Sequence, residues 1–448
     1  MKKTSIALLS ALSLGLLLSP QAQATTLSAF SSGSSSGSGS SGQQAAPAPG
    51  TPWATEISDG LVVNLIGDIL GEGISDQVGV LTGDLGIMTS IGTGKEFAII
   101  FGDSFSGANF GQGEWMSPVG VVAELDKDGK IIIKRVLNND ESVEQLINYS
   151  HNDRGLTLLP SDVINVDGTL YMQAMWNEGV GNVLYTQIWK STDQGKSWRS
   201  VSTTPASYLD GYANLLTWEQ GPDGYIYMMS SEFKRADDVY LTRFKPTDFG
   251  NRNAWEHYSI YSDGSGGWGS ALTPVLSNEV KAGEMSLRYI DDHWVLAMFN
   301  VETMAIEVRI SKEIATDWNA ITPAQVIVSG YGGWAEDQSA SNFTQLYGGY
   351  IVPGSTIDNM DLVVSQWNTS DNSRYMSTQF NVKGLDTFFG LNTPAPTARS
   401  LAPQVDRSGD QSVITVETNT VDPTTAQELA TENLMENMTE LYIVPLEE

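Results

Sequence analysis

The stretch Ser191-Thr192-Asp193-Gln194-Gly195-Lys196-Ser197-Trp198 reads S-x-D-x-G-x-x-W, a pattern called the Asp-box. Its residues suit a tight turn between two strands. The Asp193 side chain can accept hydrogen bonds from N–H groups of the turn, Gly195 can adopt a positive φ, and Trp198 can pack beneath. The pattern is typical of hairpins in propeller blades, and its role there is structural. Residues 311–318 resemble a degenerate second copy.

Outward from this turn, the chain consists of runs rich in Val, Ile, Tyr, Phe and Trp that are separated by Gly, Asp and Asn turns. Aligning the runs on their turns gives similar hairpins, with turns at 92–94, 167–168, 222–224, 291–292 and 348–349. Five units of about 50 to 70 residues indicate an all-β, five-bladed β-propeller. A β-sandwich is the main alternative, and the Asp-box favours the propeller.

Both ends of the chain differ in composition from the hairpin region. Lys2 and Lys3, the apolar run 6–18 and the small-x-small sequence 22–24 predict a signal peptide over residues 1–24. Residues 25–52 are a Ser/Gly/Pro-rich linker, predicted as a disordered tether, and residues 393–448 are predicted as a mostly disordered acidic tail. The propeller domain is therefore predicted over 53–392. We expect a secreted or cell-envelope protein, because no other run reaches the ~20 apolar residues of a membrane span.

The amino-acid composition excludes several classes of partner and of catalytic group. The 448 residues include 53 acidic and 24 basic side chains, which gives a net charge of −29. This charge argues against nucleic acid and anionic lipid as partners and favours a neutral polymer. The chain has no cysteine, which excludes disulfides and thiolate chemistry, and only three histidines. We therefore expect carboxylates to carry any proton transfer. We expect a monomer without cofactor or metal, and a structural calcium ion is not indicated, because no EF-hand-type loop is visible.

The first hairpin brings two carboxylates to its open end. Residues equidistant from a hairpin's turn centre face each other, and this turn is centred between residues 93 and 94. Asp84 and Asp103 should then be cross-strand neighbours with Cβ atoms ~4.5–5.5 Å apart. Partial burial makes such a pair retain one proton and splits its apparent pKa values. Glycoside hydrolysis needs a neutral acid beside an ionised base or nucleophile, so Asp84 and Asp103 are the candidate catalytic residues. Two solvated turn carboxylates are the alternative.

The same arithmetic gives polar residues at the open ends of the other hairpins. The expected cross-strand pairs are Asp162/Gln173, Asn214/Ser230, Glu284/Asn300 and Asn342/Ser355. In a propeller these ends converge around the mouth of the central channel. They would form a pocket for a neutral, hydroxyl-rich ligand such as a sugar.

Within this pocket, Asp162 and Glu284 are predicted to bind substrate, with Glu284 as a reserve acid. Arg288 shares the strand face of Glu284 and is predicted either to clamp a sugar oxygen or to form a structural ion pair. Aromatic faces can stack on sugar rings. The tryptophans predicted to do so lie near blade ends or in Gly-rich loops; they are Trp115, Trp268 and Trp334. Core packing is the alternative for each.

Two motifs give the chain a resemblance to a known family. Thr82-Gly83-Asp84-Leu85-Gly86 is followed by Phe101-Gly102-Asp103-Ser104-Phe105-Ser106-Gly107, and Gly283-Glu284-Met285-Ser286-Leu287-Arg288-Tyr289 and Leu159-Pro160-Ser161-Asp162 support them. Over roughly residues 60–385 the chain resembles the domain of unknown function 4185, associated with glycoside hydrolase family 183. The resemblance implies a five-bladed propeller and endo-D-arabinanase activity on the arabinan of actinobacterial cell walls. It also implies that Asp84 and Asp103 are the essential acids.

Other functions remain open from the sequence. A non-catalytic carbohydrate-binding propeller would keep the aromatic loops without needing two facing carboxylates. A sialidase is suggested by the Asp-box, but that enzyme needs an arginine cluster, and no clear cluster stands out. A furanosidase acting on L-arabinan or fructan is hard to separate from a D-arabinanase.

Overall fold

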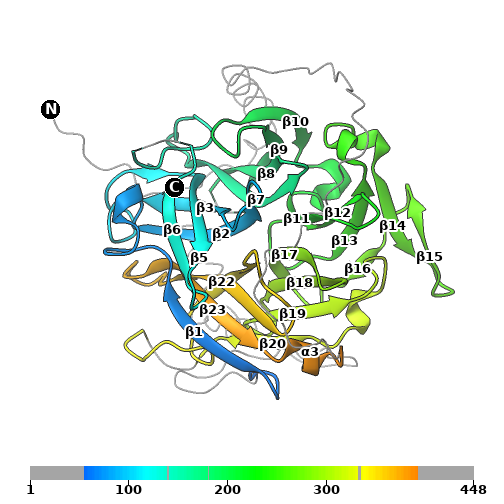
Figure 1. The fold of residues 1–448 in the computed structure, drawn as a ribbon. Helices are drawn as coiled ribbons and strands as arrows, with labels where there is room; N and C mark the ends of the chain where they lie inside the picture. The colour runs from blue at the N-terminus through cyan, green and yellow to red at the C-terminus, as the bar shows by residue number, and fades with distance from the viewer. Residues whose placement is uncertain (1–54, 139–140, 180, 331–333, 392–448) are drawn as a thin grey trace, which may run out of the picture.

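The computed structural model describes residues 55–138, 141–179, 181–330 and 334–391. In this part of the chain, five antiparallel sheets surround a common centre as the blades of a propeller (Figure 1). The predicted all-β, five-bladed fold is confirmed. The predicted signal peptide (1–24), linker (25–52) and acidic tail (393–448) lie outside the described residues.

The blades are numbered by the order of their inner strands along the chain. Blade one contains β2 (Thr82–Ser90), β3 (Phe97–Phe105), β5 (Val119–Leu125) and β6 (Ile131–Val136), with β4 (Trp115–Met116) on β3. Blade two contains β7 (Leu156–Val166), β8 (Thr169–Glu178), β9 (Val183–Ser191) and β10 (Arg199–Pro205). Blade three contains β11 (Leu215–Gln220), β12 (Ile226–Ser231), β13 (Val239–Phe244), β14 (Glu256–Ile260) and β15 (Gly266–Gly269), with β16 (Pro274–Leu276) on β13.

Blades four and five complete the ring. Blade four contains β17 (Ala282–Ile290), β18 (His293–Asn300), β19 (Ala305–Ser311) and β20 (Ala324–Val328). Blade five contains β21 (Leu346–Ile351), β22 (Asn359–Trp367), β23 (Tyr375–Lys383) and β1 (Val62–Asp68). The helices are short: η2 (Asp76–Val78), η3 (Tyr208–Gly211), η4 (Pro246–Asp248), η5 (Arg252–Ala254), η6 (Trp318–Ala320) and α3 (Leu385–Phe388). None of the helices in the described ranges is long and apolar enough to span a membrane.

Turn chemistry explains two of the inner hairpins. Asp167 and Gly168 join β7 to β8 with φ of 50° and 85°, and Asp291 and Asp292 join β17 to β18 with φ of 49° and 60°. Positive φ at both turn residues matches the right-handed twist of the paired strands, and Asp and Gly tolerate it better than other residues. The sequence located both turns correctly.

The turn between β9 and β10 contains Ser191–Trp198. The Asp193 carboxylate accepts hydrogen bonds from the Ser197 N–H at 2.9 Å and from the Ser197 hydroxyl at 2.6 Å. Gly195 has φ of 92°, and the Trp198 indole donates to its carbonyl oxygen at 3.0 Å. These bonds stay within the turn, so the segment shapes the outer edge of blade two.

The fifth predicted hairpin is wrong. Gly348 and Gly349 lie inside β21, with φ of 82° and 122°, and β21 continues to Ile351 before the chain turns. The expected pair Asn342/Ser355 therefore does not form. A Cβ on Gly349 would lie 2.9 Å from Cγ2 of Ile306 in blade four. Gly349 thus permits close packing between blades four and five, and both glycines lie at a β-bulge, which favours glycine.

The two ends of the described chain meet in blade five. β1 pairs antiparallel with β23, from Val62 opposite Lys383 to Asp68 opposite Thr378. In Figure 1 the blue β1 lies beside the orange β23. The inner strands β2, β7, β11, β17 and β21 adjoin one another in that order, and β21 adjoins β2. The ring is thereby closed by one strand from the beginning of the domain and three from its end.

Candidate active site

A bulge in blade one sets the two predicted catalytic carboxylates against each other. Gly83 pairs with Ser104 and Leu85 with Phe101, so Asp84 lies opposite the Gly102–Asp103 segment. The register expected from the turn holds on the open side of the bulge. Gly102 has a specific role, because a Cβ there would lie only 2.7 Å from Oδ1 of Asp84. The bare backbone at this position lets the carboxyl group pack against β3.

The Asp84 carboxyl is 8% exposed and reaches into blade five. The Tyr347 hydroxyl donates to its Oδ2 at 2.9 Å, whereas its Oδ1 is buried without a hydrogen-bond partner among the described residues. Burial is the main cause that raises the Asp84 pKa to about 7. The nearby Asp103 carboxylate raises this pKa further, and the Tyr375 and Tyr347 hydroxyls oppose the shift. A carboxyl in this setting holds its proton near neutral pH.

The Asp103 carboxyl is partly exposed and is fixed from the opposite side. The Trp115 indole Nε1 donates to Asp103 Oδ1 at 3.0 Å, and the Trp115 ring packs on His151 with centroids 4.4 Å apart. Burial raises the Asp103 pKa to about 6, and the bond from Trp115 lowers it. Trp115 therefore orients the Asp103 carboxylate, and its predicted stacking on a sugar stays a prediction.

Glu284 lies in a bulge at the start of β17 and is 4% exposed. The expected pairing with Asn300 is off by two residues, since Ala282 pairs with Asn300. The Arg235 guanidinium, from the loop between β12 and β13, forms an ion pair with Glu284 Oε1. The Arg235 guanidinium also lies over the ring of Tyr347, whose hydroxyl bonds Asp84, so Glu284 belongs to the surroundings of Asp84. Its charge raises the pKa of Asp84. Glu284 Oε2 is buried without a hydrogen-bond partner among the described residues, so the predicted role of Glu284 in substrate binding stays a prediction.

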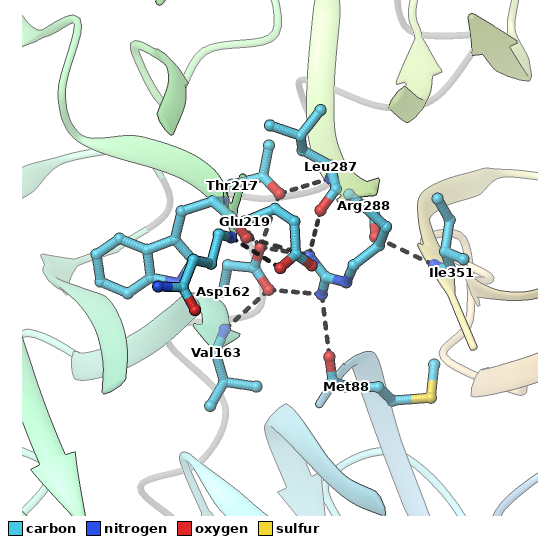
Figure 2. Close-up of polar contacts among 11 residues, drawn as sticks. Met88, Asp162, Val163, Thr217, Glu219, Leu287, Arg288 and Ile351 are labelled. Atoms are coloured by element: carbon cyan, nitrogen blue, oxygen red, sulfur yellow. Dashed lines mark hydrogen bonds and ion pairs between the residues drawn. The ribbon is translucent and has the colours of Figure 1, made fainter. Parts of the chain in front are cut away.

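Asp162 and Arg288 form a buried ion pair, which Figure 2 shows. Arg288 Nη1 lies 3.0 Å from Asp162 Oδ2 and Nη2 lies 2.9 Å from Oδ1. Asp162 also accepts from the Thr217 hydroxyl at 2.7 Å and from the Trp218 and Val163 N–H groups. Asp162 is 1% exposed, and both its oxygens are occupied.

The prediction that Asp162 and Arg288 bind substrate is therefore corrected to the structural alternative. The expected pair Asp162/Gln173 is present, but β7 begins six residues earlier at Leu156. Asp162 consequently lies inside its strand and not at an open end. Arg288 also donates to the Met88 carbonyl at 3.0 Å, so the pair joins the inner strands of four blades. The pair therefore bonds four inner strands to one another.

The remaining predicted residues do not join the carboxylates. Trp268 lies in β15, the outermost strand of blade three, where it packs on Tyr258 and lies under the Arg243 guanidinium at 4.3 Å. The structure therefore does not bring Trp268 to the two carboxylates, and its predicted stacking on a sugar stays a prediction. Trp334 is half-buried in the segment before β21. The expected pair Asn214/Ser230 is displaced, because Ser230 pairs with Leu216.

Three residues of the site were missed by sequence reasoning: Tyr347, Tyr375 and Arg235. Tyr347 and Tyr375 come from blade five, more than two hundred residues after Asp84. The hairpin arithmetic pairs only neighbouring strands, so it gives no signal for them. An aromatic cluster of Phe105, Phe110, Trp367 and Tyr375 packs beside the carboxyls and joins blade one to blade five. Among the described residues, no group of three or more His, Cys, Asp or Glu side chains is placed to hold a metal ion.

Comparisons with known proteins match the part of the chain that forms the propeller. A family model described as "Domain of unknown function (DUF4185)" matches residues 71–381, more than half of the chain. The chain belongs to the DUF4185 family. The matched range contains both acidic motifs and the inner strands of all five blades of this DUF4185 protein.

One relative and two solved structures illustrate the likeness. An uncharacterized 35.9 kDa protein in the asd 3′ region of Mycolicibacterium smegmatis is 30% identical over 315 residues, covering 66% of this chain and 92% of the relative. A crystal structure of a hydrolase candidate from Bacteroides ovatus has a TM-score of 0.51 at 13% identity and covers 72% of this chain and 90% of its own. An exo-β-1,3-galactanase from Clostridium thermocellum has a TM-score of 0.43 at 12% identity, covering 72% of this chain and 62% of its own.

Proposed function

We propose that this DUF4185 protein is a secreted glycoside hydrolase that cleaves a furanose polysaccharide, endo-acting on D-arabinan of cell-wall arabinogalactan. One observation carries the proposal: Asp84 and Asp103 face each other in two different environments. Asp84 is buried and bonded by a tyrosine, and Asp103 is partly exposed and bonded by an indole. Glycosidases use two carboxyls that differ in this way.

In the proposed reaction, Asp84 is the proton donor and Asp103 is the ionised partner. The carboxyl with the higher pKa keeps its proton, and Asp84 has a pKa of about 7 against about 6 for Asp103. Asp84 protonates the leaving glycosidic oxygen, while Asp103 acts on water or on the anomeric carbon. The indole of Trp115 keeps the Asp103 carboxylate oriented during this step.

Three features support the choice of substrate and location. The two acidic motifs resemble glycoside hydrolase family 183, whose activity is endo-D-arabinanase. A net charge of −29 favours a neutral polymer over an anionic one. The N-terminal sequence has the charged, apolar and small-residue parts of a signal peptide, which directs a protein to where cell-wall glycan lies.

The test is a product assay with matched variants. The purified protein is incubated with mycobacterial arabinogalactan and, separately, with plant L-arabinan, and the released sugars are sized by chromatography. We expect a ladder of oligosaccharides from the first substrate alone, and loss of about 10³-fold or more in kcat for Asp84→Asn and Asp103→Asn. Asp128→Asn, an exposed acid of the same blade, is the control and should keep full activity. Binding without any released product, by a folded protein, would indicate a carbohydrate-binding propeller instead.

A further inference from the structure

A line of contacts runs from blade four to blade one through side chains of blades three and five. Glu284 in β17 is ion-paired with Arg235. The Arg235 guanidinium lies over the Tyr347 ring, 5.2 Å from its centroid, and 5.5 Å from the centroid of Phe299. The Tyr347 hydroxyl then donates to Asp84 Oδ2 at 2.9 Å.

The members of this line are held rigidly. Glu284 and Tyr347 are each 4% exposed, and the Arg235 side chain is 15% exposed. They come from three different elements: the β12–β13 loop, β17 and β21. Arg235 itself has φ of 55°, which a non-glycine residue adopts only when its surroundings hold it there. The proposed reaction as written above uses none of the three.

We propose that Arg235 and Glu284 are positioning residues: together they fix Tyr347 against the Asp84 carboxyl and set the charge that this carboxyl meets. The proposal rests on the proposed function for its catalytic meaning. Glu284 orients the guanidinium, the guanidinium covers one face of the tyrosine ring, and the ring can then aim its hydroxyl only at Oδ2. Glu284 thereby acts through Asp84 and not on the substrate.

The charged groups around Asp84 make the proposed positioning measurable through the pKa of Asp84. The titratable groups that face Asp84 are Asp103 from β3, Tyr375 from β23, Tyr347 from β21 and Glu284 from β17. Glu284 raises the Asp84 pKa, and the Tyr347 bond lowers it. Arg235 neutralises Glu284, so removal of Glu284 and removal of Arg235 must move the Asp84 pKa in opposite directions.

Two variants test whether the Asp84 pKa moves in opposite directions when Glu284 or Arg235 is replaced. Glu284→Gln removes a negative charge and should lower the pKa of Asp84, which moves the alkaline limb of kcat/KM to lower pH. Arg235→Gln leaves Glu284 uncompensated and should move the same limb to higher pH, as should Tyr347→Phe, which loses the donor to Oδ2. Arg235→Gln should also lower kcat about 100-fold by misplacing the tyrosine. Arg235→Lys keeps the charge and should restore the wild-type limb, with kcat only partly restored.

A second measurement separates this inference from the proposed function. Protein labelled with ¹³C at the aspartate carboxyl is titrated by NMR, and the Asp84 signal is identified by its absence in Asp84→Asn. Opposite shifts of that titration in Glu284→Gln and Arg235→Gln support the positioning role even if no glycan is hydrolysed. An unchanged Asp84 titration in both folded variants overturns it. If Glu284→Gln is also inactive with that titration unchanged, Glu284 is a catalytic carboxylate.

Discussion

Arg288 donates hydrogen bonds from both of its terminal nitrogens to the two carboxylate oxygens of Asp162. This ion pair connects the inner strand of blade four to that of blade two. The same guanidinium bonds the Met88 carbonyl of blade one, and the same carboxylate accepts from Thr217 of blade three. Four inner strands therefore depend on one ion pair. Figure 2 shows how these partners converge on it.

Loss of Arg288 should therefore destabilise the whole ring. Removing one member of a buried pair leaves the other charge without compensation, at a cost of about 3–5 kcal/mol. We expect Arg288→Met to lower the free energy of unfolding by about that amount, measured by urea denaturation. Lys134→Gln breaks the exposed Lys134–Glu124 pair on the outer edge of blade one and should cost under about 1 kcal/mol. Equal losses in the two variants would contradict the central role of the ion pair.

The activity should have a narrow pH optimum. The reaction needs Asp103 ionised and Asp84 protonated, and their pKa values are about 6 and about 7. The pair titrates as a unit, so the profile of kcat/KM should be a bell with its maximum between these two values. A profile that stays flat from pH 5 to pH 9 would show that these carboxyls do not limit the reaction.

Asp84→Asn should stabilise the fold at alkaline pH while abolishing activity. The Asp84 pKa is raised from 3.8 to about 7 on folding, so its stabilising contribution is complete below pH 3.8 and is lost as pH rises through about 7. At pH 8 the wild type carries a buried charge that the variant lacks, which costs on the order of 4 kcal/mol. Thermal melts at pH 4 and pH 8 test this: the variant should gain in melting temperature relative to wild type only at the higher pH.

Trp115→Phe should move the acid limb of the pH profile upward. The phenyl ring keeps the packing on His151 but has no N–H for Asp103, and the lost bond is one that lowers the Asp103 pKa. A higher pKa for Asp103 means that ionisation requires a higher pH. Trp268→Phe, at the outer edge of blade three, is the matched control and should leave both limbs in place. A shift in the control of the same size would mean that the effect is not local.

The part of the fold that could be predicted is the part determined by adjacent residues. Four inner hairpins follow from turn residues such as Asp167-Gly168, and Asp84 and Asp103 were brought together because their strands share one turn. The prediction of the fifth hairpin is wrong because Gly348 and Gly349 have the positive φ of a turn but lie inside β21, where blade four requires the small size of Gly349. A glycine pair in a hairpin turn and a glycine pair at a close contact inside a strand look the same in the sequence.

The rest of the site depends on contacts between blades. Tyr347 reaches Asp84 only because blade five closes against blade one, and Arg235 reaches Glu284 from a loop of blade three. No spacing along the chain encodes these distances. Asp162 shows the converse error, since its predicted cross-strand partner was right but the true start of β7 placed it deep in its strand.

The closure of blade five determines when this protein can fold. Among the described strands, β1 is synthesised first and β23 last, so their pairing joins segments separated by nearly the whole domain. Contacts this distant in sequence make folding slow, because the chain must lose much of its freedom before they form. A growing polypeptide therefore cannot complete the ring until its final blade has emerged. Until then β23 is missing and β1 has no strand beside it, and the unfinished edges of the sheets are open to other chains.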